Sequence, residues 1–426
     1  MPRELTFIHA ADLHLGAPFR GLGNLSPTWG ARLARAIPEA LGRVVDAAIG
    51  NGVDFVVVAG DIFDNARPSY ADYRCFVGAL ERLRGEGIAV YLVPGNHDPY
   101  VTWRSDYAKL PDNAVWLSDE GPGYALYRKD GEPMCVLAGR GYYNQSFPVG
   151  ECVAERVTRA DAVAALGGDA VDAPFSVGVL HTGLDVDTTP SKAPLDPAVL
   201  LASDIDYWAL GHIHARRSIP REHPRVCFSG IIQGRDVKET GPRGVNLVTL
   251  REGRPNEVRF VPCASVVWQQ LAVDVEGLET LADVEEAVVD AMYKANSQSL
   301  CEEMCVRVTL TGTAALHDAL ARPGVLSELR EAVNGACGQF FCDAIADATK
   351  RPRSYDVLRA ADLFPAALLD ASEEVAEDGA GLKAYLQEEF AARGLALPLS
   401  GLAGLDATVE SARDEVLDLL EEGGAR

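Results

Sequence analysis

The stretch that decides the fold is Phe7-Ile8-His9-Ala10-Ala11-Asp12-Leu13-His14, close to the start of the sequence. Its apolar residues predict a short buried β-strand. A carboxylate and an imidazole follow, and residues two apart on an extended segment lie on the same side. The stretch therefore predicts a strand that presents Asp12 and His14 together at its carboxyl end.

The same pairing of an apolar run with a ligand-type side chain recurs four more times along the chain. The other apolar runs are Phe55–Val58, Val90–Val93, Val177–Leu180 and Tyr207–Leu210. The ligand-type residues behind them are Asp61, Asn96, His181, and the pair His212 and His214. Loops at the carboxyl ends of strands in layered α/β folds converge on one crevice, so all of these side chains can meet. This arrangement predicts a two-metal hydrolase.

The residue types fit that chemistry better together than one by one. Alone, Gly60-Asp61 is typical of a turn, and a lone His181 is typical of a hydrogen-bonded surface histidine. The alternate histidines of Gly211-His212-Ile213-His214 are harder to explain by packing. Mixed carboxylate, amide and imidazole ligands suit an ion such as manganese or iron. Two such ions act on phosphate esters as paired Lewis acids that activate a bridging water.

The chain of 426 residues is too long for one compact core. Up to about residue 262, strands, ligand loops and helices alternate, with helices expected at 37–48, 70–83 and 153–166. The strand-like segments 226–228, 245–250 and 258–261 are expected to form an antiparallel second sheet that completes a sandwich. Strands and helices then alternate again to about residue 350. The predicted divisions are residues 1–265, 266–350 and 351–426, and the fold class is α/β.

Charge and composition narrow the possible functions. The net charge is −23, with 27 Lys/Arg against 32 Asp/Glu up to residue 262 and 12 against 30 beyond it. This acidity argues against a protein that coats nucleic acid by charge alone. It does not exclude a DNA-binding face, because the electrostatic field at such a face depends on local patches of charge. Nine cysteines without a disulfide-like pattern fit a reducing cytoplasm. No secretory signal or membrane-spanning run is recognisable, so a cytoplasmic protein without a membrane association is expected.

These motifs, in this order and spacing, resemble those of the calcineurin-like metallophosphoesterase superfamily. Three stretches narrow the match to the SbcD-type DNA repair exonucleases, and among these to the YhaO-like branch. They are Phe7–Gly16, Gly60–Asp64, and the loop from Gln233-Gly234-Arg235 to Glu239-Thr240-Gly241-Pro242. The resemblance covers the first 262 residues well and the next 90 or so loosely.

The resemblance implies a fold and a ligand assignment. The fold would be a four-layer metallophosphoesterase β-sandwich flanked by helices, followed by a small α/β capping domain and a helical acidic tail. One ion would be held by Asp12, His14, Asp61 and His214. The other would be held by Asp61, Asn96, His181 and His212, with Asp61 as the bridge. His97 would be the catalytic histidine, which is not a ligand, and Asp64 would orient it.

The resemblance also implies an activity, a two-metal-dependent DNA nuclease that acts in DNA repair. It would combine double-strand exonuclease and single-strand endonuclease activity and hydrolyse phosphodiesters with a metal-bridging water. The two divalent ions are expected to be Mn²⁺. The alternatives are a phosphatase or small-molecule phosphodiesterase on the same scaffold, and a DNA-end-binding subunit with a decayed site, which the intact ligand set disfavours. Candidate contacts to the DNA backbone are Arg20, Arg235, Lys238 and Arg243.

Partners follow from the same resemblance. The chain has no Gly-x4-Gly-Lys-Ser/Thr motif, so it should not hydrolyse ATP itself. The resemblance implies an SMC-like coiled-coil ATPase of the SbcC/YhaN type as a partner, and a homodimer. An apolar stripe near the end of the sequence has two interpretations, a helix packed on its own domain or a docking helix for that ATPase. The stripe consists of Leu405, Val409, Ala412, Val416 and Leu419.

Overall fold

The computed structural model describes residues 3–19, 26–360, 364–395 and 404–424. They belong to two compact units, which are described separately. The first unit comprises Met1–Leu271, Val289–Arg307 and Asn334–Ala344, and the second comprises Ala272–Val288, Val308–Val333 and Ile345–Arg426.

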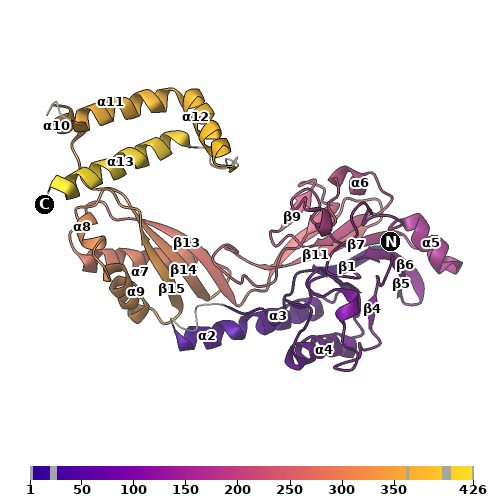
Figure 1. The fold of residues 1–426 in the computed structure, drawn as a ribbon. Helices are drawn as coiled ribbons and strands as arrows, with labels where there is room; N and C mark the ends of the chain where they lie inside the picture. The colour runs from indigo at the N-terminus through magenta and orange to yellow at the C-terminus, as the bar shows by residue number, and fades with distance from the viewer. Residues whose placement is uncertain (1–2, 20–25, 361–363, 396–403, 425–426) are drawn as a thin grey trace. The chain divides into compact units, whose positions relative to one another are not determined.

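The first large sheet has the strand order β12-β11-β1-β2-β3-β4. Figure 1 labels β1, β4 and β11 of this sheet. The four strands from β1 to β4 are parallel, and β11 and β12 extend the sheet antiparallel beyond β1. The strands are β1 (Glu4–Ala10), β2 (Phe55–Ala59), β3 (Ala89–Val93), β4 (Ala114–Trp116), β11 (Gly244–Arg251) and β12 (Glu257–Pro262).

The second large sheet has the order β5-β6-β7-β8-β10-β9. Its four central strands are parallel, and each edge strand pairs antiparallel with its neighbour. Because parallel strands end at the same edge of a sheet, the loops after these strands gather there. The strands are β5 (Gly123–Lys129), β6 (Glu132–Arg140), β7 (Phe175–His181), β8 (Tyr207–Gly211), β9 (Arg217–Ile219) and β10 (Val226–Phe228).

The expectation of an antiparallel second sheet from residues 226 to 262 is wrong. Strand β10 pairs parallel with β8, whereas β11 and β12 belong to the first sheet. The reason is that β11 is apolar on both faces, as suits the interior of a sheet. Val245 and Leu247 pack on the helix side of the first sheet, and Val248 and Leu250 pack between the two sheets.

Three apolar cores separate four layers, as the family resemblance implied. Helices α3 (Ala36–Gly50) and α4 (Tyr70–Gly85) pack on the outer face of the first sheet. A middle core lies between the sheets. There the Phe7 ring stacks on Phe55 and contacts Tyr207 edge-on. Helices α5 (Arg159–Leu166) and α6 (Pro197–Leu201) cover the outer face of the second sheet. The four-layer sandwich flanked by helices is confirmed.

Two of the three predicted helices are observed as expected, and the third begins later than predicted. Helices α3 and α4 match the predictions for residues 37–48 and 70–83, and Ser69 and Asp72 form a capping box before α4. The helix predicted from residue 153 begins only at Arg159. Thr158 caps it by accepting a hydrogen bond of 3.0 Å from the Asp161 N–H, so residues 153–157 form turns instead. Helix α2 (Pro27–Ala34) was not predicted.

After residue 265 the chain forms a small three-stranded sheet of order β13-β14-β15, with helices between its strands. The alternation of strands and helices predicted up to about residue 350 is present. These elements are β13 (Val266–Asp274), α7 (Leu281–Ser297), β14 (Glu303–Thr311), α8 (His317–Leu320), α9 (Val325–Ala336) and β15 (Phe340–Asp347).

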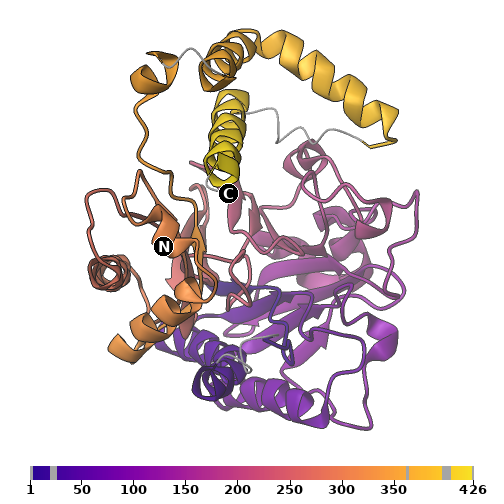
Figure 2. The same cartoon turned by 60° about the vertical axis from the view of Figure 1, so that its left-hand side comes forward.

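The remaining described residues are helical, and α11 packs against α10, α12 and α13 (Figure 2). These helices are α10 (Tyr355–Ala360), α11 (Phe364–Glu377), α12 (Gly379–Ala392) and α13 (Leu405–Gly424). Of the predicted stripe, all members except Leu419 line an apolar groove with α11 and α12, and Leu419 is exposed. In the part of the chain described, no helix combines the length and apolarity that crossing a membrane requires.

Candidate metal centre

Four of the seven predicted ligands have an unusual backbone conformation. Asp12, His14 and Asp61 adopt left-handed conformations with φ of 52°, 46° and 49°, and His212 has φ of 97°. Such conformations cost on the order of 1–3 kcal/mol per residue and concentrate at functional sites. Hydrogen bonds between the loops after β1 and β2 hold them: the Asp12 N–H donates to Gly60 O and the His14 N–H to Asp61 O, each at 3.0 Å. The loops are thereby fixed with these side chains aimed at one point.

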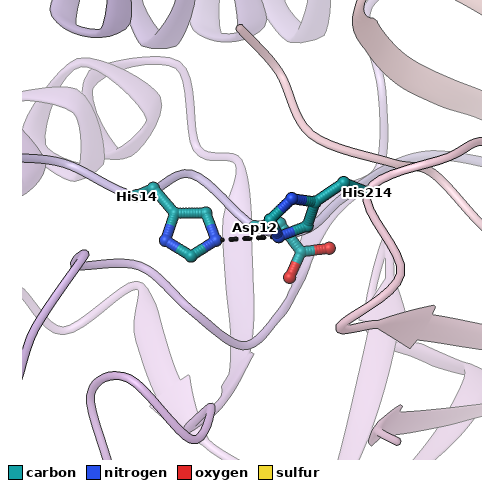
Figure 3. A group of neighbouring side chains, drawn as sticks. All are labelled: Asp12, His14 and His214. Carbon is teal, nitrogen blue, oxygen red and sulfur yellow. Dashed lines mark hydrogen bonds between the residues drawn. The ribbon is translucent and has the colours of Figure 1, made fainter. Parts of the chain in front are cut away.

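The first cluster contains Asp12, His14 and His214, whose ligand atoms all lie within 4.8 Å of one another. The two imidazoles face each other with Nε2 atoms 3.1 Å apart, beside the Asp12 carboxylate (Figure 3). Two nitrogens bound to one ion at about 2.1 Å and at a right angle would lie about 3 Å apart. The spacing of these nitrogens thus fits two neighbouring ligands of one cation.

The second cluster contains Asp61, His181 and His212, again with ligand atoms within 4.8 Å. His181 Nε2 lies 3.4 Å from Asp61 Oδ2, and that same oxygen lies 3.8 Å from His14 Nε2 of the first cluster. The other Asp61 oxygen accepts a hydrogen bond of 2.9 Å from the His97 N–H. One oxygen of Asp61 is therefore fixed by the backbone, and the other lies between the two clusters.

Each of the four histidines has an oxygen atom within 3.2 Å of the ring nitrogen that points away from the clusters. A proton held on the outer nitrogen leaves a lone pair on the inner one, which is the tautomer that a metal ligand needs. The outer contacts are His181 Nδ1 to the Ala59 carbonyl (2.9 Å), His14 Nδ1 to Asp64 (3.2 Å), His212 Nε2 to Asp187 (3.1 Å) and His214 Nδ1 to Glu239 (2.6 Å). All four inner nitrogens can therefore donate to a cation.

The side-chain amide of Asn96 provides a second test of the fit. With its oxygen toward the histidines, Oδ1 lies 3.3 Å from His181 Nε2 and 2.9 Å from His212 Nδ1. When neither facing ring nitrogen carries a proton, these three acceptor atoms repel one another unless a cation lies among them. The reverse orientation would instead let the NH2 donate to both nitrogens and the oxygen accept from Lys192 Nζ at 3.0 Å. A bound cation would select the first orientation, in which Asn96 adds an amide oxygen to the donors of the second cluster.

The electrostatics of the centre also favour cations. Burial opposes ionisation of Asp61, but the neighbouring His181 and His14 hold the pKa of this carboxyl far below its usual range. Burial likewise opposes protonation of His181, yet the Asp61 carboxylate raises its pKa to about 9. Asp61 thus remains ionised in a buried setting, where a carboxylate needs a compensating positive charge. Together with the His/Asp clusters, this indicates a divalent metal site.

His97 lies at the edge of the centre, and its partner differs from expectation. Its Nδ1 lies 2.6 Å from the backbone carbonyl of Asp64, not from the Asp64 carboxylate. The carboxylate instead contacts His14 Nδ1 and accepts a hydrogen bond of 3.0 Å from Arg235. Asp64 therefore positions His97 through its main chain and His14 through its side chain.

The four basic residues predicted to contact DNA have different surroundings. Arg235 pairs with Asp64 and, at 3.1 Å, with Glu239, so its guanidinium braces the acceptors behind two histidines. Arg243 donates to the carbonyls of His214 and Thr240, each at 2.8 Å, and is half-buried. The Lys238 side chain is exposed. Arg20 lies outside the described residues.

Sequence reasoning missed three acidic residues that organise the centre. Asp187 and Glu239 orient His212 and His214, as described above. Buried Asp98 accepts hydrogen bonds from the N–H groups of Ile62 (2.8 Å), Phe63 (3.1 Å) and Gly95 (3.0 Å), and so ties the loop after β2 to the loop after β3. Glu239 lies in a stretch that carried the family resemblance, and Asp98 follows the predicted ligand Asn96 by two residues, so both had an available signal. Asp187 lies in a loop without a recognisable motif.

Comparison with known proteins agrees with this geometry. Residues 5–216 match the family model described as calcineurin-like phosphoesterase, and residues 268–350 match the middle domain of metallophosphoesterase YhaO. The "uncharacterized metallophosphoesterase YhaO" of Bacillus subtilis is 34% identical over 334 residues, which is 78% of each chain.

More distant matches are proteins named "DNA double-strand break repair protein Mre11". That of Haloferax volcanii is 28% identical over 69% of this chain and 62% of its own length. That of Methanopyrus kandleri is 25% identical over 48% of this chain and 44% of its own length, so the match spans about half of such relatives. The matched family model and the extensive match to YhaO place the chain in a known group. The chain belongs to the calcineurin-like metallophosphoesterase superfamily, in its YhaO-like branch, and is a metal-dependent phosphoesterase.

Proposed function

We propose that this phosphoesterase is a two-metal-dependent DNA nuclease that acts in DNA repair in the cytoplasm. It would degrade double-stranded ends and cut single-stranded regions. The observation that carries the proposal is that both clusters are complete, each histidine having an oxygen within 3.2 Å of its outer nitrogen. A decayed site would be expected to lose such contacts first. The Mre11 relatives, named for DNA double-strand break repair, favour DNA over a small phosphate ester as the substrate.

In this proposal, Asp12, His14, Asp61 and His214 hold one ion, and Asp61, Asn96, His181 and His212 hold the other. Manganese suits this mixture of oxygen and imidazole donors. When bound, the two ions supply Lewis acidity that polarises the phosphate and lowers the pKa of water.

His97 would assist departure of the sugar oxygen. The Asp64 carbonyl at Nδ1 keeps a proton on that nitrogen and fixes the ring, so Nε2 is the atom left to face the substrate. A proton on Nε2 can then pass to the leaving oxygen as the phosphodiester bond breaks.

Digestion of end-labelled duplex and circular single-stranded DNA with manganese tests the proposal. Wild-type protein should shorten the duplex and open the circle. His97→Ala should lose roughly 10²–10⁴-fold of this activity. If both proteins degrade DNA equally, the activity comes from a contaminant or the role of His97 is wrong. Rapid turnover of p-nitrophenyl phosphate with no action on DNA would instead favour the phosphatase alternative.

We further propose that the C-terminal helices dock a coiled-coil ATPase of the SMC type, and that the nuclease is a homodimer. The docking proposal is supported by the apolar groove between α11, α12 and α13, whose lining includes Val375, Leu386 and Val409. An amphipathic helix of a partner would fit such a groove. Val409→Lys, or deletion after Arg353, should abolish co-purification with the ATPase while nuclease activity persists. Unchanged co-purification would refute docking at this groove, and sedimentation of the purified protein tests the dimer.

A further inference from the structure

A pocket of about 290 Å³ opens beside the metal centre. Four loops that follow parallel strands contribute to it, so it lies on the same side of the sheets as the ligands. It is lined by Asp64, Asn65, Ala66, Asn96, His97, Gln145 and Lys192. Asn96 belongs to the second cluster and His97 is the proposed acid, so a molecule in this pocket would contact both.

Lys192 is the cationic residue of this pocket, and its loop is firmly held. The Lys192 carbonyl accepts a hydrogen bond of 2.7 Å from the Gly183 N–H, and its own N–H donates to Thr189 O at 2.8 Å. Thr182 Oγ1 donates to the next carbonyl, that of Ala193, at 2.6 Å. The same loop carries Asp187, which orients His212. The position of Lys192 is thus coupled to that of a metal ligand.

Lys192 makes no ion pair with any residue that the structure describes. The carboxylate that shares its pocket, Asp64, is already engaged by Arg235 and His14. In a chain of net charge −23, an unpaired cation beside a phosphoesterase centre indicates an anionic ligand.

Asn96 links this cation to the metal centre. When the Asn96 oxygen faces His181 and His212, its NH2 group lies 3.0 Å from Lys192 Nζ, so two hydrogen-bond donors face each other. Two donors at this distance need a shared acceptor, and an oxygen placed between them could accept from both. One amide would therefore bind a cation on its oxygen side and an anion on its nitrogen side.

We infer that Lys192 and the Asn96 amide form a phosphate-binding subsite, which takes a non-bridging oxygen of the substrate phosphate. The inference rests on the proposed role of Asn96 as a metal ligand and deepens the proposed phosphodiesterase function. An ammonium group suits this task because it binds phosphate as a point charge with three donors. The exposed amides of Asn65 and Gln145 lie at the same pocket and can contact neighbouring parts of the ester.

The test compares Lys192→Gln, Lys192→Arg and a matched control, Lys109→Gln, which changes an exposed lysine outside the pocket. In manganese-loaded full-length protein, Lys192→Gln should weaken binding of inorganic phosphate, measured by calorimetry, by roughly tenfold or more. It should also raise KM for bis(p-nitrophenyl) phosphate more than it lowers kcat. Lys192→Arg should recover most of both losses, and bound manganese should stay at the wild-type level in all variants.

Phosphate affinity that is the same in Lys192→Gln and wild type would overturn the subsite. Reduced manganese in Lys192→Gln would also overturn it, because Lys192 would then support the ligand loop instead of the substrate. A wild-type protein that binds phosphate through Lys192 but cleaves no diester would contradict the proposed nuclease and leave the phosphate subsite standing. The two proposals therefore fail separately.

Discussion

The outer nitrogens of the two histidines in the first cluster each face a carboxylate. In the second cluster, one outer nitrogen faces a backbone carbonyl and the other faces a carboxylate. Asp64 and Glu239 are braced by the Arg235 guanidinium, and the Glu239 side chain is only 13% exposed. Asp187 of the second cluster is 35% exposed and has Thr189 as its other partner. The two ion positions are alike in ligand type but differ in the support behind the ligands.

This difference has an energetic consequence. Burial disfavours the charge on Glu239, but hydrogen bonds from His214 and Arg235 bring its pKa well below the usual range. Hydrogen bonds from Thr189 and His212 lower the pKa of Asp187 to about 2. This carboxylate depends less on its protein partners than Glu239 does, because water can replace its contacts. The first ion position should therefore depend more strongly on its outer carboxylates than the second one does.

Asp61 belongs to both ion positions, so its replacement should weaken both and remove the difference between them. We expect the largest loss of bound metal and activity from this change. In Asp61→Asn the oxygen between the clusters loses its charge, while an amide can still occupy the same space. Manganese content, measured by elemental analysis, should fall from about two equivalents to less than one. Diesterase activity should fall more than hundredfold, beyond the roughly 10–100-fold typical of outer-partner changes. Retention of two ions would show that Asp61 is not the shared ligand.

Glu239→Gln should affect one position alone and be the next largest change. The amide can still accept from His214 but loses the charge that pairs with Arg235. One of two manganese affinities should weaken by about 10–100-fold, measured by titration with electron paramagnetic resonance. Glu222→Gln, at an exposed glutamate, serves as the matched control and should leave both affinities unchanged. An equal loss of manganese affinity at both positions would argue against two separately supported ion positions.

Asp187→Asn should weaken the other position by a smaller factor, about tenfold or less, because solvent can substitute for this half-exposed side chain. The same titration measures it. A larger loss than in Glu239→Gln would reverse the ranking of the two clusters.

His9 offers a histidine for comparison that has no carboxylate behind it. It is fully buried between Tyr207 Oη (3.0 Å) and Leu210 O (3.1 Å), and burial lowers its pKa to about 3. Below the unfolded pKa of 6.5 the unfolded state binds a proton that the folded state rejects, so the free energy of unfolding must fall. The loss between pH 6.5 and 5.5 should be about 1 kcal/mol. Denaturant unfolding with EDTA should show this slope reduced in His9→Gln; an identical slope would contradict it.

Much of the centre could be predicted because each ligand directly follows an apolar run. Strand ends are local features, and the order of Asp12, Asp61, Asn96 and His181 along the chain is enough to bring them together once the sheets form. The outer acceptors depend on contacts between loops far apart in sequence. For example, 25 residues separate Asp187 from His212, and no pattern links them.

The sheet assignment failed for the same reason. Apolar residues predict that β10 and β11 are buried strands, but they do not show that β10 pairs with β8 and β11 with β1. Long-range pairing decides which sheet each strand joins. Similarly, the sequence shows that Arg235 is basic, but not that Asp64 and Glu239 engage it.

The left-handed backbone at Asp12, His14 and Asp61 imposes two demands on the same positions. Asp, Asn and His are the side chains that tolerate this conformation best after glycine, and they are also good metal donors. Replacement by valine or leucine would therefore damage the loop as well as the chemistry. For trapping an uncut substrate, Asp12→Asn is the better inactive protein, since it retains a polar side chain suited to that backbone.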